Sequence, residues 1–304
     1  MVTRDVPATH LRIARTRAEL RAALQAAPRP VGLVPTMGWL HAGHRSLIAR
    51  AKSENETTVV TIFVNPRQFG DPTDLEQYPR NEDRDVAICV EEGADIVFVP
   101  TVDEVYPPGS DTSVSVGAIA RPLEGAARPG HFDGVATVVA ILFNLVGADR
   151  AYFGQKDAQQ LLVIRQMARD LAIPIEVIAH PTVREPDGLA MSSRNVHLAP
   201  AERQAAPVVR RALLAGRARW EAGERSADAI RAEMRAVLAA EPLADPDYVS
   251  AADATTLEEL SVIDGPTLLS MAVRFGSTRL IDNVPLQGVR LVGSDPRARE
   301  GRKA

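Results

Sequence analysis

The stretch VGLVPTMGWLHAGHRSLI, residues 31–48, joins an apolar strand pattern to a helical pattern across a turn with two histidines. The apolar run is Val31–Val34, and the helical pattern is evident from Ser46 onward. A helix N-terminus offers unpaired backbone N–H groups and the positive end of a dipole, which suits a bound phosphate. His41 and His44 either cap the helix or supply donors that follow charge onto a leaving group. Because two histidines and two glycines meet at one strand–helix junction, we favour phosphate binding.

Working outward, short apolar runs alternate with helical patterns. The expected strands are Val31–Val34, Val59–Val64, Asp95–Val99, Ser113–Val116, Arg150–Phe153 and Ile175–Ile178. The expected helices are Arg17–Ala27, His44–Ser53, Asn81–Glu92, Val135–Val146 and Asp157–Leu171. This alternation predicts an α/β fold with a doubly wound parallel sheet, which is Rossmann-like and binds ligands at the carboxyl ends of its strands. The HAGH turn, residues 65–69 and residues 153–157 all follow such strand ends.

The pattern changes after His180. Residues 181–200 are rich in Pro, Gly, Ser and Arg, as a linker or a binding loop is. Expected helices at Ala201–Glu221 and Ala227–Ala240 precede expected strands at Asp247–Ala251, Thr267–Phe275 and Thr278–Asp282, with a turn at Gly276. We therefore predict a Rossmann-like domain over residues 1–181 and a smaller α+β C-terminal domain over 182–304, with a disordered tail from about Gly293.

The composition of the chain and the motifs that it lacks argue against several classes of function. The net charge of −4 argues against a nucleic-acid partner. Cys89 is the single cysteine, so an intrachain disulfide framework is excluded and a reducing compartment is expected. The sequence lacks both a membrane-length apolar run and the apolar core of a signal peptide, and we expect no membrane partner and a cytoplasmic location. Zinc-ligand spacing, a Walker loop and a Gly-x-Gly-x-x-Gly loop are also missing, so no protein-held metal site is predicted.

Two further clusters are candidates for chemistry. Lys156 either is solvated or neutralises a phosphate chain, and Gln160 lies one helical turn later. Asp157 caps the helix, orients Lys156, holds a ribose hydroxyl or lies near Mg²⁺. Residues 191–194, Met-Ser-Ser-Arg, are either ordinary surface or a lid that gives hydroxyls and a guanidinium to phosphates.

These residues belong to a longer series of motifs. PTMGWLHAGHRSL, TIFVNPRQF, YPR, RPGHFDGV, YFGQKDAQQ and PTVREPDGLAMSSRN follow one another between Val31 and Asn195, and RFGSTRLIDN occupies 274–283. In this order they closely resemble the pantothenate synthetase (pantoate–β-alanine ligase) family. The HxGH element alone identifies only the wider nucleotidyltransferase superfamily.

The resemblance implies a two-step ligation. Pantoate attacks the α-phosphate of ATP to give a bound pantoyl adenylate and pyrophosphate, and β-alanine then attacks the acyl group to give pantothenate and AMP. The implied partners are pantoate, β-alanine and ATP, with Mg²⁺ and a homodimer.

The resemblance also implies the site residues. His44, as proton donor, is catalytic together with His41 and Lys156. The implied ATP-binding residues are Met37, Gly38, Trp39, Leu40, His41, Ala42, Gly43, His44, Gly154, Gln155, Lys156, Asp157, Val183, Met191, Ser192, Ser193 and Arg194. Gln68 and Gln160 correspond to the pantoate-binding glutamines, and Gln68 also to the β-alanine site. Asn65, Tyr78 and Arg128 correspond to supporting residues. Trp39, Ala42, Arg67 and Ala158 occupy variable positions, and Arg67 adds a cation beside Gln68.

Two other functions compete with the ligase. An adenylyltransferase would keep the adenylate as its product, and a silent adenylate-binding or scaffold protein would carry out no chemistry. Gln68, Gln160 and a second domain able to enclose an intermediate favour the ligase. The intact His41, His44, Lys156 and Arg194 argue against a silent protein.

Overall fold

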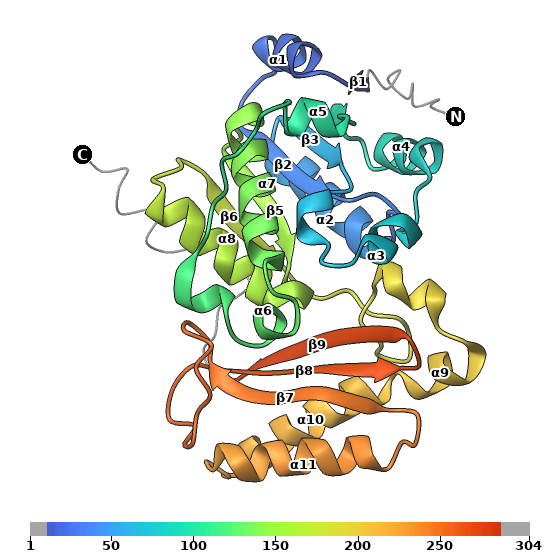
Figure 1. Ribbon diagram of the computed structural model, residues 1–304, viewed down its shortest axis with the longest axis vertical. Coiled ribbons are helices and arrows are strands. Elements are labelled where there is room, and N and C mark those ends of the chain that lie inside the picture. Colours follow the sequence, from blue (N-terminus) through green and yellow to red (C-terminus); the bar gives the residue numbers. More distant parts are fainter. Residues whose placement is uncertain (1–10, 287–304) are drawn as a thin grey trace, which may run out of the picture.

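The computed structural model describes residues 11–286, which form a parallel sheet and a smaller antiparallel sheet (Figure 1). The six parallel strands are β1 Arg12–Ala14, β2 Val31–Thr36, β3 Thr57–Ile62, β4 Ile96–Phe98, β5 Arg150–Gly154 and β6 Glu176–His180. They lie in the order β1-β4-β3-β2-β5-β6. The predicted doubly wound fold is confirmed.

Helices connect these strands. The α-helices are α1 Arg17–Gln25, α2 Ala42–Glu54, α3 Pro72–Gln77, α4 Glu82–Glu91, α5 Val102–Val105, α6 Glu124–Ala127, α7 His131–Val146 and α8 Ala158–Asp170. Short 3₁₀ turns occur at η1 Pro66–Gln68, η2 Gly117–Ala120, η3 Gln155–Asp157 and η4 Ser193–His197.

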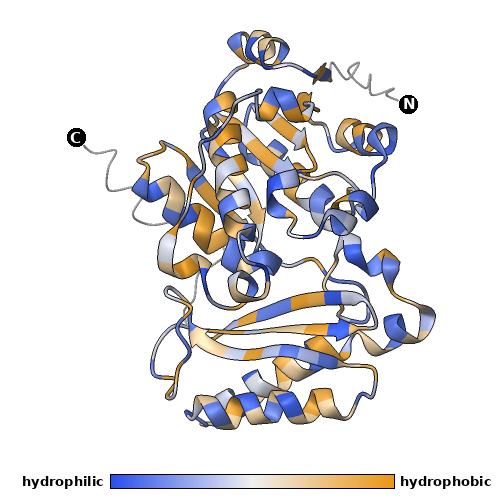
Figure 2. Cartoon of the chain, in the orientation of Figure 1, coloured by the Kyte–Doolittle hydropathy of each residue, from blue (hydrophilic) through white to orange (hydrophobic). Residues whose placement is uncertain are grey.

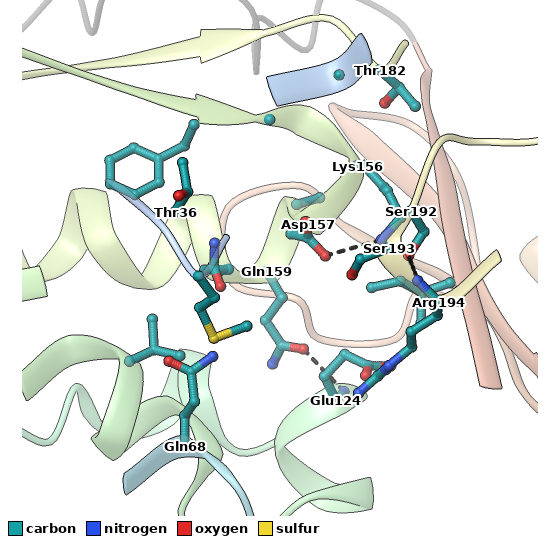
Figure 3. Close-up of a pocket in the computed structure, with 18 of the residues that line it drawn as sticks. Thr36, Gln68, Glu124, Lys156, Asp157, Gln159, Thr182, Ser192, Ser193 and Arg194 are labelled. Carbon is teal, nitrogen blue, oxygen red and sulfur yellow. Dashed lines mark hydrogen bonds and ion pairs between the residues drawn. The ribbon is translucent and has the colours of Figure 1, made fainter. Parts of the chain in front are cut away.

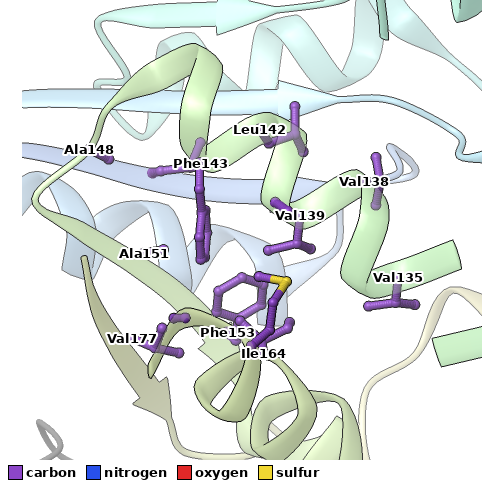
Figure 4. Close-up of a cluster of buried hydrophobic side chains, with 14 of the residues drawn as sticks. Val135, Val138, Val139, Leu142, Phe143, Ala148, Ala151, Phe153, Ile164 and Val177 are labelled. Atoms are coloured by element: carbon purple, nitrogen blue, oxygen red, sulfur yellow. The ribbon is translucent and has the colours of Figure 1, made fainter. Parts of the chain in front are cut away.

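Both faces of the parallel sheet are buried, which explains the continuous apolar runs. Leu33 of β2 packs in a large core with α7 and α8, and Figure 4 shows Phe143 and Ile164 of these helices beside Phe153 of β5. Val34 points to the opposite face and packs with α2 and α4. Successive side chains of one strand therefore serve two different cores.

The site lies where the winding of the sheet reverses. β2 pairs with β3 on one side and with β5 on the other. Helix α2, which follows β2, packs on the Val34 face, whereas α8, which follows β5, packs on the Leu33 face. The two chain segments leave the sheet in opposite directions, and this divergence opens a crevice at the carboxyl ends of β2 and β5.

The C-terminal unit places two helices on one face of an antiparallel sheet. Its elements are α9 Pro200–Ala205, α10 Val208–Glu221, α11 Ala227–Ala239, β7 Asp245–Asp253, β8 Thr267–Phe275 and β9 Thr278–Leu286. The strand order is β7-β8-β9, and Gly276 makes the predicted turn with φ +55°. Figure 2 shows alternating hydrophobic and hydrophilic bands along α11, as expected for a helix with one buried face.

Three details of the sequence-based prediction were wrong or incomplete. Residues 113–116 join neither sheet: the Val114 N–H donates to Thr137 Oγ1, and Val114 and Val116 pack against the large core. The predicted helix 201–221 is broken between α9 and α10, where Pro207 lacks an N–H. The three-residue strand β1 was missed because it is too short to show a periodicity. The predicted tail from 293 lies outside the described residues.

The two units share a buried polar seam. Glu124 of α6 forms a bidentate ion pair with Arg279 of β9, at 2.6 and 2.9 Å, and accepts a hydrogen bond from the Tyr248 hydroxyl at 2.9 Å. The Arg279 Nε also donates to Asp247, at 2.6 Å. Leu257 and Leu268 of the C-terminal unit complete the large core. The boundary between residues 181 and 182 stays a prediction.

We predict that Arg279→Met lowers the free energy of unfolding by about 3–5 kcal/mol, because it leaves the Glu124 carboxylate buried without its cation. Urea denaturation checks this. Arg274→Met removes a half-exposed arginine of the same sheet and should change stability little. Adding Glu124→Gln to Arg279→Met should recover part of the loss, and a double variant less stable than Arg279→Met would contradict the argument.

Candidate active site

A cavity of about 300 Å³ opens at the carboxyl ends of β2, β3 and β5, and the C-terminal sheet and the 181–194 segment close it (Figure 3). The volume is that of a small-molecule site. Residues from the HAGH turn, the segment after β3 and the turn after β5 line it together, so the predicted meeting of these three clusters is confirmed.

The HAGH turn orients both imidazoles through their Nδ1 atoms. The backbone N–H of Gly43 donates to His41 Nδ1 at 3.1 Å, and the N–H of His41 donates to His44 Nδ1 at 3.3 Å. A nitrogen that accepts an N–H bond carries no proton, so in each neutral ring the proton is on Nε2. Two N–H groups of the helix start are thereby used for capping, and the turn presents two Nε2–H donors in their place.

Burial keeps these rings neutral. It lowers the pKa of His41 to about 4, and the nearby Lys156 charge lowers it further. Burial likewise lowers the pKa of His44 to about 3, with smaller contributions from His41 and Lys156. The ring centroids are 4.1 Å apart, a spacing at which two imidazolium ions would repel each other. At neutral pH both histidines are therefore neutral hydrogen-bond donors.

A carboxylate that the sequence analysis missed clamps the turn. Asp85 of α4 is buried and accepts the backbone N–H groups of Trp39 at 2.7 Å and Leu40 at 2.8 Å. A side chain at Gly38, which has φ +82°, would meet Asp85 Oδ2 at 2.9 Å, so glycine permits the close approach. Arg84 stacks on the Trp39 ring and donates to the Leu40 carbonyl at 2.7 Å.

The turn after β5 is held from the C-terminal unit. Asn283 of β9 is buried, and its side-chain amide donates to the carbonyl oxygens of Gln155 at 3.0 Å and Lys156 at 2.9 Å. The Lys156 ammonium lines the cavity and lies 3.4 Å from Asp157. The position of this lysine thus depends on contact between the two units.

The 181–194 segment forms the outer wall of the cavity. Arg184 makes a bidentate ion pair with the buried Asp282 of β9, at 2.7 and 2.9 Å, and the Met191 N–H donates to the Val183 carbonyl. Ser192 caps η4 by accepting the Arg194 N–H. Burial raises the pKa of Tyr78, whose hydroxyl bonds Ser193.

The two predicted pantoate glutamines lie in the same cavity. Asn65 donates to Gln68 Oε1 at 2.9 Å and to the Gly134 carbonyl at 3.1 Å, and it accepts from the Tyr106 hydroxyl at 2.7 Å. Because the Gln68 oxygen is already bonded, its NH₂ group remains for a ligand. Gln160 also lines the cavity, whereas its neighbour Gln159 is buried and binds the backbone around α6.

Most, but not all, predicted ATP-binding residues line the cavity. Those outside it are Gly38, Trp39, Leu40, Ala42 and Gln155. Leu40 is fully buried in the core beneath α2, Trp39 contacts Arg84, and Gln155 faces Asn283. Asp85, Glu124, His131, Arg279 and Asn283 were missed as site residues, although the quoted RPGHFDGV and RFGSTRLIDN motifs contain three of them.

The described residues contain no cluster of three metal-binding side chains and no helix able to span a membrane. Of the carboxylates that line the cavity, Glu124 and Asp282 are each bonded to an arginine, which leaves Asp157, paired only with Lys156, as the accessible acid.

Comparison with known proteins gives one consistent result. The family model described as Pantoate-beta-alanine ligase matches residues 12–285. A pantothenate synthetase from Roseiflexus castenholzii is 61% identical over 91% of this chain and 100% of its own length. The crystal structure of a Thermus thermophilus pantothenate synthetase is 50% identical, with a TM-score of 0.86 over 90% of this chain and 98% of that chain. A Francisella tularensis pantoate-beta-alanine ligase, complexed with beta-gamma ATP and beta-alanine, is 32% identical, with a TM-score of 0.74 over 90% and 97% of the two chains.

We predict that the free energy of unfolding falls as the pH drops from 7 to 5. The unfolded histidines take up protons near their ordinary pKa of 6.5, but folded His41 and His44 do so only near pH 4 and 3. The unfolded state therefore gains protons first as the pH falls. At pH 5 each of these two histidines lowers the free energy of unfolding by on the order of 1–2 kcal/mol. Urea titrations at both pH values test this. His44→Leu should flatten the pH dependence and His197→Asn, at an exposed position, should not; equal slopes in all three proteins would contradict it.

Proposed function

This chain belongs to the Pantoate-beta-alanine ligase family, and we propose that it joins pantoate to β-alanine at the expense of ATP. A pantoate carboxylate oxygen attacks the α-phosphorus, and the bond to the bridging oxygen breaks to release pyrophosphate. The β-alanine nitrogen then attacks the acyl carbon of the pantoyl adenylate, and AMP leaves with the electron pair of the C–O bond. The products are pantothenate, AMP and pyrophosphate.

The observation that carries this proposal is the arrangement of donors around one cavity. His41, His44 and Lys156 line this cavity together with Gln68, and we propose that the phosphate chain of ATP lies against the two Nε2–H groups and the Lys156 ammonium. In the first step negative charge moves onto the pyrophosphate oxygens, which fixed donors stabilise without reorganisation. Lys156 supplies a mobile positive charge, and Arg194 supplies a second cation from the outer wall.

His44 acts here as a neutral donor. The family resemblance assigns it as the proton donor. Its low pKa means that the donating group is the Nε2–H of a neutral imidazole. A neutral Nε2–H strengthens a hydrogen bond to an oxygen as that oxygen gains charge, without first having to become an imidazolium. His41 makes the same kind of contact from the adjacent position.

Gln68 and Gln160 suit the acid that is activated. Pantoate carries two hydroxyl groups besides its carboxylate, and a neutral amide hydrogen-bonds hydroxyl oxygens without stabilising the carboxylate so strongly that its nucleophilicity is lost. Asn65 fixes the Gln68 amide with its NH₂ group available for a ligand. A side chain at Gly134 would lie 2.3 Å from the Arg67 carbonyl, so this glycine lets α7 approach η1 and support Gln68.

We propose that ATP binds as its Mg²⁺ complex. Mg²⁺ prefers one or two carboxylates together with phosphate oxygens and waters, and this fits a cavity in which Asp157 is the accessible acid. When bound, the ion neutralises phosphate charge.

We also propose, on the family resemblance, that the protein is a homodimer in the cytoplasm. Sedimentation velocity tests the dimer.

Two features of the cavity distinguish the ligase from an adenylyltransferase. Such an enzyme needs only the phosphate donors, whereas a ligase also needs binding groups for an organic acid and a cover over the reactive anhydride. Gln68 and Gln160 supply the binding groups, and the β9 wall supplies the cover.

The decisive assay follows AMP and pyrophosphate with ATP and Mg²⁺, with and without pantoate and β-alanine. We expect exchange of labelled pyrophosphate into ATP to require pantoate, and net AMP release to require both organic substrates. AMP release that needs neither pantoate nor β-alanine would overturn the proposal.

His44→Ala should lower the rate of pantoate-dependent pyrophosphate exchange by about 10²- to 10³-fold, the loss typical of one transition-state donor. Lys156→Ala should also slow the exchange, because the phosphate charge is no longer balanced. Lys52→Ala is the matched control, since Lys52 pairs with Asp95 outside the cavity. Exchange at the wild-type rate in His44→Ala would remove this histidine from the mechanism.

A further inference from the structure

A third histidine in the cavity has the opposite tautomer to the HAGH pair. His131, the first residue of α7, has its Nδ1 atom 2.9 Å from the backbone carbonyl oxygen of Gln68. A carbonyl can only accept, so Nδ1 carries the proton and Nε2 of the neutral ring is an unprotonated acceptor. His41 and His44 present Nε2–H donors, whereas His131 presents a lone pair.

The His131 ring is fixed, and its Nε2 atom is available. The backbone N–H of His131 donates to the Arg128 carbonyl at 3.1 Å, and the ring meets Phe132 edge-on at a centroid distance of 5.0 Å. Within residues 11–286, Nε2 has no hydrogen-bond partner, and His131 lines the cavity.

A cation lies beside this acceptor. Arg128 Nη2 is 3.4 Å from the same Gln68 carbonyl oxygen that His131 contacts, so the guanidinium and the imidazole are neighbours. Both side chains line the cavity near Gln68. A cation next to a proton acceptor is complementary to a short amino acid that carries a carboxylate at one end and an amine at the other.

We propose that His131 Nε2 accepts the proton of the attacking amine while Arg128 holds the carboxylate of the same substrate. This inference rests on the proposed ligase function and adds a catalytic residue to its second step. The substrate class is a short ω-amino acid, which β-alanine represents.

The step balances as follows. The substrate enters with an ammonium group, and one N–H proton moves to His131 Nε2, which leaves an amine with its lone pair. The amine nitrogen bonds to the acyl carbon, and the bond from that carbon to the adenylate oxygen breaks. The second N–H proton passes to the departing phosphate oxygen of AMP, and the imidazolium of His131 releases its proton to solvent.

The charges around His131 support this order of events. Burial and the Arg128 charge, with a smaller effect from Arg194, lower the pKa of His131 to about 4, and the Gln68 carbonyl and Glu124 oppose the shift. The free ring is therefore neutral and ready to accept. A substrate carboxylate on Arg128 would cancel part of the depressing charge and make Nε2 more basic, while burial makes the substrate ammonium more acidic.

The test uses His131→Asn, His131→Ala and the exposed control His197→Asn. Asparagine keeps an N–H donor near the position of Nδ1, so the bond to Gln68 survives while the Nε2 acceptor is lost. We expect His131→Asn to retain pantoate-dependent pyrophosphate exchange but to lose about 10²- to 10⁴-fold in β-alanine-dependent AMP release, as is typical of a lost general base. Hydroxylamine has an unprotonated nitrogen at neutral pH and needs no base. With hydroxylamine in place of β-alanine, His131→Asn should therefore release AMP at the same rate as the wild-type protein.

Each alternative has its own outcome. If His131 only supports Gln68, His131→Ala loses both half-reactions and His131→Asn restores both, which overturns the proposal. Equal losses with β-alanine and hydroxylamine in His131→Asn would also overturn it. Failure of the wild-type protein to exchange pyrophosphate would instead refute the ligase function itself. Histidine ¹⁵N shifts provide a direct readout, since His131 should show a protonated Nδ1 and His41 and His44 a protonated Nε2.

Discussion

The pairing of β2 with β5 in the middle of the parallel sheet is the constraint on which the site depends. Gly32 and Leu33 are in register with Arg150 and Ala151, and after β2 and β5 end the chain continues into helices on opposite faces of the sheet. The HAGH turn and the Lys156 turn are therefore brought together by backbone hydrogen bonds between strands more than a hundred residues apart in sequence. Side chains such as Asp85 and Asn283 then fix each turn. The donors can be rigid because the strands beneath them are buried on both faces.

The parallel sheet and the convergence of its strand ends were predictable from the sequence, because buried strands leave continuous apolar runs such as Val31–Val34. The segment 113–116 shows the limit of this argument: its alternation reflects one-sided packing of Val114 and Val116 on a core, and the sequence does not reveal whether a partner strand exists. The break at Pro207 was visible in the sequence but was overridden by the helical pattern around it.

The types of residue in the candidate site could be predicted from the sequence, but the protonated nitrogen of each histidine could not. Spacing located His41, His44 and Lys156, yet the proton positions depend on which backbone group meets each Nδ1 atom. That information exists only in three dimensions, and it also separates His131 from the other two histidines. Asp85 and Asn283 were missed for a related reason: both act on main-chain groups that are distant in sequence, and the place of Asn283 in the RFGSTRLIDN motif does not reveal which groups it bonds.

The seam between the two units has a consequence for how such a chain can be recombined. Glu124 meets Arg279 across it, Asn283 bonds the backbone of the Lys156 turn, and Leu257 and Leu268 fill the core of the larger unit. A chimera joined within the 181–194 segment would keep the covalent linker but replace one side of every one of these contacts. The C-terminal unit can therefore be exchanged intact only together with the residues that it contacts on the other side of the seam.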